Sequence, residues 1–151
     1  MIGCASTSVF PKGEVDPELF GIWVGGPDGL RWIIFSNDSF VFSIGEIAFS
    51  RGTWYKSVLN GRNYLILIEN ENFSNGQWIT NRNRIEWQFA YLVVETELEA
   101  KAFIEFARRV NAIDENFDEP DKLTSAIGLR AVGHLAVQSA QIFEGNYVRI
   151  K

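Results

Sequence analysis

The chain has 151 residues, of which 46% are hydrophobic, 14% aromatic and 22% charged, a composition typical of one folded domain rather than a disordered chain. The formal net charge of −5 argues against binding to nucleic acid or to an anionic membrane along the whole sequence. A single cysteine excludes an internal disulfide, and a single histidine excludes a multi-histidine metal site.

Residues 1–16 differ from the rest of the chain because they are mostly small and polar and have no hydrophobic periodicity. Pro11 and Gly13 lie among them. Such a segment is typical of a flexible leader or tether. We therefore divide the chain into a leader at 1–16 and a single β-rich domain at 17–151.

The leader begins with Met-Ile-Gly-Cys-Ala-Ser at residues 1–6. This sequence resembles the end of a bacterial lipoprotein signal, where an apolar stretch closes on a small residue and the lipidated cysteine. The resemblance implies a lipid anchor on Cys4 and a place in the bacterial cell envelope, with membrane contact only through that anchor. The alternative is an ordinary free cysteine near a frayed terminus, in a protein that is secreted or cytoplasmic.

Turn signals recur at short intervals between residues 19 and 94, and runs of aromatic and β-branched residues separate them. Asn60-Gly61 is the strongest signal, because both residues tolerate the positive φ of a two-residue hairpin. The others are Pro27-Asp28-Gly29, Ser36-Asn37-Asp38, Asn75-Gly76 and the weaker Asn81-Arg82-Asn83. The predicted strands lie near 19–25, 30–35, 39–44, 47–57, 63–69, 77–80 and 84–94. This spacing predicts an antiparallel meander that forms a barrel or a sandwich.

Two of these strands have special features. In the strand 47–57 the apolar phase shifts between Phe49 and Trp54, and a β-bulge at Gly52 would account for the shift. In the next strand the run 64–68 is apolar on both faces. This pattern predicts cover on both sides, with the later helix as the candidate for the second side.

A helix is predicted at 97–112, where the hydrophobic pattern changes from period two to helical spacing. Thr96 and Glu99 form a capping box at its start. The expected buried stripe consists of Leu98, Ala102, Phe106 or Phe103, Val110 and Ile113. Residues 114–121 follow as an acidic loop, which we expect to be solvated rather than to bind calcium, because its spacing is not that of an EF-hand.

The stretch 122–139 allows either a helix or two short strands. Gly128 and Gly133 weaken a helix, so we favour strands at 127–132 and 134–139, which also help to close a barrel.

The chain is expected to end with a turn at 144–146 and a strand at 147–150. Together the predicted elements indicate an α+β domain that is mainly antiparallel β. Its form is expected to be a barrel or a strongly curved meander with one clear helix.

The first strand opens with Gly21-Ile22-Trp23, and this Gly-x-Trp motif resembles the start of the lipocalin and calycin barrels. The resemblance implies a barrel in which Trp23 plugs the closed end and an arginine from a late strand, Arg149, stacks on it. The chain lacks the lipocalin Thr-Asp-Tyr loop motif and its helix precedes the last strands, so we expect a lipocalin-like outlier. In the alternative interpretation, Trp23 is an ordinary core aromatic.

Five aromatic residues are candidates for lining a ligand cavity in such a barrel: Trp54, Tyr64, Trp87, Phe89 and Tyr91. The last three alternate with other residues along one strand, so we expect them to point inward together. Small barrels either hold one ligand or fill with side chains, and so many large rings favour a filled core.

Motifs for catalysis are scarce. The sequence has no Gly-x-Ser-x-Gly elbow and no phosphate-cradling loop, and nothing singles out a pair of carboxylates, so we assign no catalytic residue, metal or cofactor. The leading hypothesis is a non-enzymatic cell-envelope lipoprotein whose lipocalin-like barrel binds a small apolar ligand or a protein partner. One alternative is a structural or interaction domain with a filled core and no ligand, in which the acidic loop or the Arg82/Arg84 tip would be the working part. A carboxylate-dependent hydrolase ranks last.

Overall fold

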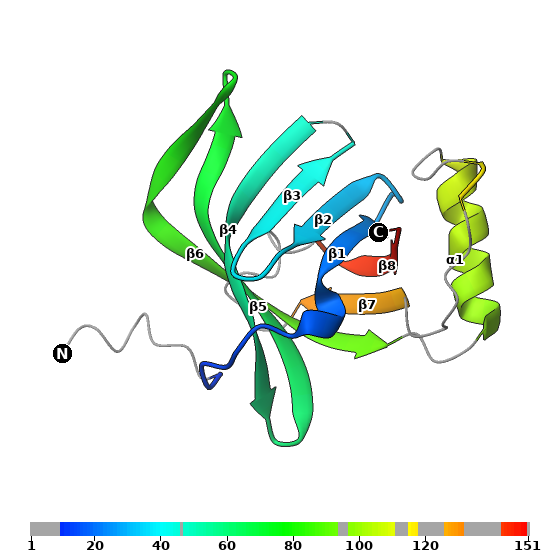
Figure 1. Cartoon of the computed structure of the whole chain (residues 1–151), viewed down its shortest axis with the longest axis horizontal. Coiled ribbons are helices and arrows are strands. Elements are labelled where there is room, and N and C mark those ends of the chain that lie inside the picture. Colours follow the sequence, from blue (N-terminus) through cyan, green and yellow to red (C-terminus); the bar gives the residue numbers. More distant parts are fainter. Residues whose placement is uncertain are drawn as a thin grey trace.

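The computed structural model describes residues 10–45, 47–93, 97–110, 115–117, 126–131 and 143–150. In this part of the chain, eight antiparallel strands follow one another around a closed barrel, and the last pairs with the first (Figure 1). The helix α1 (Glu97–Arg109) lies outside the barrel. The strands are β1 (Gly21–Gly25), β2 (Arg31–Phe35), β3 (Phe40–Ile44), β4 (Ile47–Leu59), β5 (Arg62–Ser74), β6 (Gln77–Val93), β7 (Ala126–Ala131) and β8 (Gly145–Arg149). The expected α+β, mainly antiparallel fold is confirmed.

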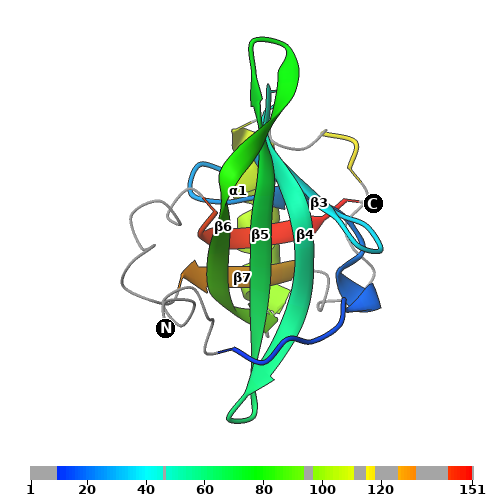
Figure 2. The same ribbon diagram turned by 90° about the vertical axis from the view of Figure 1, so that its left-hand side faces the viewer.

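Two hairpin turns lie where the sequence predicts them. Asn60 and Gly61 join β4 to β5 with φ angles of 53° and 75°, and Asn75 and Gly76 join β5 to β6 with φ angles of 51° and 77°. Both central residues of each turn are thus in the left-handed region that a two-residue hairpin requires. Figure 2 shows the three long strands that these turns connect side by side.

The strand β6 runs without a break through the weak turn predicted at 81–83, so that prediction is wrong. Glu71 pairs with Thr80 and Glu69 pairs with Ile85, which leaves residues 81–84 of β6 opposite Asn70 alone. The extra residues bend the strand as a bulge does. The strand continues because β5 offers pairing partners on both sides of this irregularity.

The strand β4 is irregular around Gly52, where the sequence predicts a bulge. Its register against β5 shifts between Arg51 and Gly52, and the extra residue there is Asn70 of β5. Against β3 the extra residue is Phe49. A Cβ on Gly52 would collide with the carbonyl oxygen of Ile68, so only glycine allows the two backbones to approach this closely.

The buried face of α1 agrees only in part with the predicted stripe, because Val110 packs on the buried cluster and Phe106 is half-buried, whereas the first two residues of the stripe are not buried. Leu98 is 78% exposed and Ala102 is also exposed. Among the described side chains of the helix, Ala100, Ile104 and Ala107 are buried. They form a cluster on the outer side of β1, β7 and β8 with Val24, Ala126 and Val148. Two of the three are alanines, whose small side chains let the helix approach the sheet, and the hydrophobic pattern gave them less weight than Leu98.

The helix lies on the side of the barrel opposite the long strands β4, β5 and β6 (Figure 1, Figure 2). It therefore does not cover β5, as we had expected from the apolar run 64–68. It ends at Arg109, short of the predicted end at 112. The predicted cap Thr96 and the side chain of Phe103 lie outside the described residues. Among the described residues, no helix combines the length and the apolar character that a membrane crossing needs.

Of the two strands expected within 122–139, the first is confirmed as β7, and the second lies outside the described residues. The last strand, β8, begins two residues earlier than predicted, so Gly145 and Asn146 belong to the strand and not to the turn before it. The reason is tertiary: the two residues pair with Leu129 and Gly128 of β7.

Residues 10–16, which belong to the expected leader, run along the barrel wall. The Lys56 amide donates to the Glu14 carbonyl over 2.9 Å, and the Ser57 hydroxyl donates to the Pro11 carbonyl over 2.6 Å. These contacts join backbone groups and isolated side chains, so they leave no periodic pattern in the sequence. Residues 1–9 lie outside the described part of the chain.

Candidate functional site

The interior of the barrel is lined by aromatic and aliphatic side chains. Trp87, Phe89 and Tyr91 of β6 are at most 8% exposed, and they share the core with Trp54 of β4. The inward alternation predicted for this strand is therefore confirmed. Tyr64 is only half-buried and alternates with the inward-facing residues of β5, so it lies on the outer side. The structure thus brings together four of the five residues suggested for a cavity.

Phe143 fills the centre of the interior, although the sequence did not single it out. Its fully buried ring lies 4.2 Å from Phe42, 5.4 Å from Trp87 and 5.5 Å from Phe89, measured between ring centroids. The Tyr147 hydroxyl donates to the Phe143 carbonyl oxygen over 2.6 Å. Burial raises the pKa of Tyr147 well above its ordinary value, so the hydroxyl keeps the proton that it donates.

One end of the barrel is closed by the residues before β1. The indole Nε1 of Trp23 donates to the Leu19 carbonyl over 2.9 Å, and the Nη1 of Arg149 donates to the Glu18 carbonyl over 2.8 Å. Trp23 and Arg149 are paired between β1 and β8, with the guanidinium carbon 5.4 Å from the centre of the indole ring. The structure therefore brings these two residues together, and both bind the short 3-10 helix Pro17–Leu19.

A second contact at the closed end involves Asp16. The Tyr91 hydroxyl donates to a carboxylate oxygen of Asp16 over 2.9 Å, and the Lys56 ammonium lies 3.7 Å from the same oxygen. Burial and the hydrogen bond to Asp16 raise the pKa of Tyr91 well above its ordinary value. Asp16 therefore has both a hydrogen-bond donor and a cation as partners.

The opposite end, which we call the mouth, carries exposed apolar side chains. They form what we call the apolar rim, and they are Ile47 and Phe49 of β4 and Ile79 and Ile85 of β6, between 39% and 71% exposed. Strand pairing places them at one end of the barrel, because Ser50 lies opposite Asn72 and Asn72 lies opposite Ile79. In Figure 1 this end of β5 and β6 projects at the top, beyond the other strands.

A polar group lies inside the barrel below the apolar rim. We call it the Glu69 group, and it comprises Glu69, Asn72, Asn81 and Trp87. Glu69 is 3% exposed, and its Oε1 accepts from the amides of Asn72 and Asn81 over 2.5 Å and 3.2 Å. Its Oε2 accepts from the indole Nε1 of Trp87 over 3.0 Å. Across the described residues, none of the salt bridges involves Glu69.

Ser50 is a further polar residue on the inner face of the mouth. It lies opposite Phe42 of the core on one side and Asn72 of the Glu69 group on the other, so the three side chains share a face. Its hydroxyl oxygen is buried and has no hydrogen-bond partner. The mouth therefore combines an acceptor group, an unpaired hydroxyl and an apolar rim.

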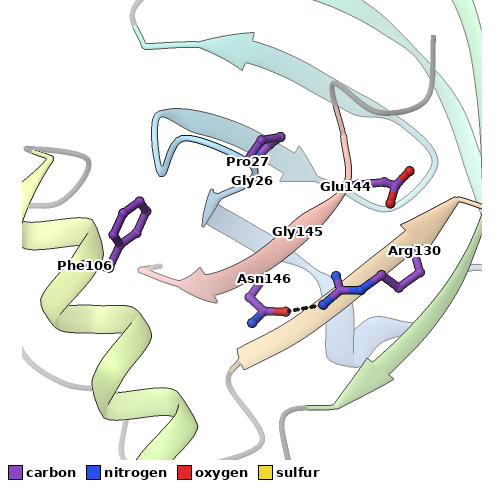
Figure 3. Close-up of a pocket in the computed structure, with 7 residues that line it drawn as sticks. All are labelled: Gly26, Pro27, Phe106, Arg130, Glu144, Gly145 and Asn146. Atoms are coloured by element: carbon purple, nitrogen blue, oxygen red, sulfur yellow. Dashed lines mark hydrogen bonds between the residues drawn. The ribbon is translucent and has the colours of Figure 1, made fainter. Parts of the chain in front are cut away.

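A separate cavity of about 590 Å³ lies between α1 and the barrel, next to the turn that follows β1 (Figure 3). Phe106 and Pro27 provide apolar surface, and Arg130 and Glu144 bring opposite charges to the same wall. The guanidinium of Arg130 donates to Asn146 over 3.4 Å. Another cavity, of about 510 Å³, lies at the closed end between residues 11–17 and β4.

Three residues suggested by the sequence have no described side chain. Cys4 lies outside the described residues, so the lipid anchor stays a prediction. The side chains of Arg82 and Arg84 are also not described, but both residues lie within β6, so the hairpin tip predicted there is wrong. The sequence analysis in turn missed Glu69. One signal could have revealed it: Glu69 follows Leu65 and Leu67 at a spacing of two, so period-two alternation places a carboxyl group in an inward-facing row.

No family model matches the chain, and neither a curated protein nor a solved structure matches it. The likeness to lipocalins therefore rests on the eight-stranded barrel of the described residues and on the Gly-x-Trp motif.

Proposed function

We propose that the protein is a non-enzymatic binding protein that takes a small apolar ligand at the mouth of its barrel. The observation that carries this proposal is the difference between the two ends. The segment before β1 closes one end through Trp23 and Arg149, whereas the other end exposes the apolar rim. The open end of a small β-barrel is a common place for one ligand.

A row of contacting aromatic rings leads from the rim into the barrel. The ring of Phe42 lies 5.9 Å from Phe49 at the rim and 4.2 Å from Phe143 in the core. A ligand on the apolar rim would remove exposed apolar area from water, which stabilises a complex by about 25 cal/mol per Å² of buried apolar surface. Grouped exposed apolar side chains of this kind are typical of interaction sites.

A second candidate function is an interaction domain with a filled core, in which the apolar rim meets a protein partner instead of a small ligand. Phe143 favours this alternative, because its ring occupies the centre of the interior between Trp87 and Phe89. The two candidates share one surface and differ in the occupant.

A neutral environment-sensitive dye tests the proposal. We expect saturable one-to-one binding that Ile79→Ser at the rim weakens. Val58→Ser is the matched control, because Val58 is similarly exposed, at 55% against 51%, but lies beside the cavity at the closed end. Loss of binding in the control alone would place the ligand at the closed end. Absence of dye binding by the folded protein would leave the filled-core alternative.

We also propose that the protein is anchored in the bacterial cell envelope by a lipid on Cys4. The support is the likeness of residues 1–6 to the end of a lipoprotein signal. In bacterial cells that express the chain behind a full signal peptide, Cys4→Ser should move the protein from the membrane fraction to the soluble fraction. Unchanged membrane partitioning of the variant would disprove the anchor.

A further inference from the structure

We infer, on the basis of the proposed function, that the ligand of the barrel is an amphiphile with a cationic hydrogen-bond-donating head group, such as a primary ammonium on an apolar chain. Glu69 would accept the head group, and the apolar rim would contact the chain. The inference starts from three features of the mouth: the acceptor capacity of Glu69, the lack of a cationic partner for it among the described residues, and the Ser50 hydroxyl, which has no partner in the same part of the chain.

Glu69 keeps unused acceptor capacity. Both of its oxygens accept hydrogen bonds from N–H donors, which is the pattern of an ionised carboxylate with about four acceptor sites. Asn72 and Asn81 use Oε1, whereas only Trp87 uses Oε2. Oε2 therefore keeps acceptor capacity for a further donor.

The charge of Glu69 has no cation as a partner within the described part of the chain. A buried carboxylate is costly unless it is paired, and neutral amides and an indole compensate its charge only in part. Glu71, two residues further along β5, shows the contrast, because Arg51 donates to both of its oxygens over 3.1 Å. A cationic ligand would give Glu69 the positively charged hydrogen-bond donor that Arg51 provides for Glu71.

Ser50 is the independent observation that points to a ligand. Its side chain is 0% exposed and its hydroxyl lacks a partner, on the same inner face as Asn72. The next residue of β4 on this face is Gly52, which has no side chain and lies opposite Glu69. A small head group that donates to Glu69 could also satisfy the hydroxyl of Ser50, which can accept as well as donate.

The apolar rim lies beside these groups on the neighbouring strands and suits the chain of such an amphiphile. Ile85 is opposite Glu69, Ile79 is opposite Asn72, and Phe49 precedes Ser50. A bare metal ion fits less well, because calcium and magnesium require several oxygen ligands and the described residues contain no group of three acidic, histidine or cysteine side chains.

Three probes with the same chain and different head groups test the inference on the unaltered protein: dodecylamine, dodecanol and dodecanoate, each below its micellar concentration. Isothermal titration calorimetry should rank dodecylamine first, dodecanol second and dodecanoate last. The amine should bind about tenfold more tightly than the alcohol. Equal affinities, or a preference for dodecanoate, would overturn the inference and leave the proposed apolar site intact. Failure of all three to bind would overturn the proposed function as well.

Two variants of equal net charge then separate a specific contact from general attraction to an acidic protein. Glu69→Gln should remove the preference for the amine, whereas Glu71→Gln on the other face of β5 should keep it. Ser50→Ala should weaken amine binding by about two- to tenfold, as expected for one lost hydrogen bond. An amine preference that survives Glu69→Gln would contradict the role of Glu69. If that variant does not fold, the ranking of the three probes and the Ser50→Ala result still decide the question.

Discussion

The two ends of the barrel each hold a carboxylate, and the two carboxylates differ in their partners. At the closed end, Asp16 accepts from Tyr91 and lies 3.7 Å from the Lys56 ammonium, so its charge is matched within the chain. At the mouth, the donors to Glu69 in the described part of the chain are all neutral. The difference is that the charge of Asp16 is matched within the chain, whereas Glu69 keeps acceptor capacity for the ligand that we propose.

The apolar side chains differ between the ends in the same way. At the closed end, Leu19 is buried and Phe20 packs edge to face on Trp54, with ring centroids 6.1 Å apart. At the mouth, Ile47 is 71% exposed. Residues before β1 therefore shield the core at the closed end, where Val58 is an exposed apolar side chain, whereas the four residues of the apolar rim are exposed together at the mouth.

The largest effects are expected from two fully buried rings, Trp23 at the closed end and Phe143 at the centre of the interior. Trp23→Ala and Phe143→Ala should each lower the free energy of unfolding by about 3–5 kcal/mol in urea denaturation, because each removes a fully buried ring. Phe143→Ala should also change the binding of the neutral dye, since its cavity opens below the mouth. Equal effects of both variants on binding would contradict the functional difference between the ends.

The next largest effect is expected at the bend that positions Glu69. In Gly52→Ala the new methyl group would collide with the carbonyl oxygen of Ile68, so β4 and β5 must separate. The free energy of unfolding should fall by about 1–3 kcal/mol, and the near-UV circular dichroism of Trp87 should change. The exposed neighbour Thr53 serves as the control, because Thr53→Ala should change stability by less than about 0.5 kcal/mol.

Tyr91→Phe tests the closed end. Loss of the hydrogen bond to Asp16 should lower the free energy of unfolding by about 1–2 kcal/mol at neutral pH. Because folding raises the pKa of Tyr91, its contribution is complete below the ordinary tyrosine pKa of about 10 and is lost as the pH rises above that value. Between pH 8 and pH 11, the free energy of unfolding measured by urea denaturation should therefore fall less steeply with pH in the variant than in the unaltered protein. An identical slope would show that Tyr91 ionises equally in both states.

The smallest expected effect has the opposite sign. Ser50→Ala removes a buried hydroxyl that has no partner, so the free protein should gain about 1 kcal/mol of stability. The thermal midpoint measures this gain, and Ser36→Ala is the control, because the Ser36 hydroxyl is exposed and bonded to Ser39. A loss of stability in Ser50→Ala would mean that the hydroxyl already has a partner in the free protein.

Much of the barrel could be predicted from local sequence features. The positive φ of the Asn60-Gly61 turn is a property of those two residue types, and the inward row Trp87, Phe89 and Tyr91 follows from the alternation of any strand. The break predicted at 81–83 was wrong because strand pairing with β5 overrides a local turn preference.

Less of the candidate site could be predicted from local sequence features. Glu69 and Asn81 lie 12 positions apart, and Ser50 meets Asn72 only through the register between β4 and β5. Phe143 carries no motif, and its position in the core depends on the strand that follows it.

The sequence by itself determined the strand content, the tight hairpins and the inward face of β6, because turns and period-two alternation are local properties of the chain. Tertiary structure alone decided which face of α1 is buried, that Phe143 fills the interior, and that Glu69 and Ser50 share the mouth. These features depend on the register of neighbouring strands and on the close approach of α1 to β1 and β8. Contacts between residues distant in sequence, rather than local preferences, determine both.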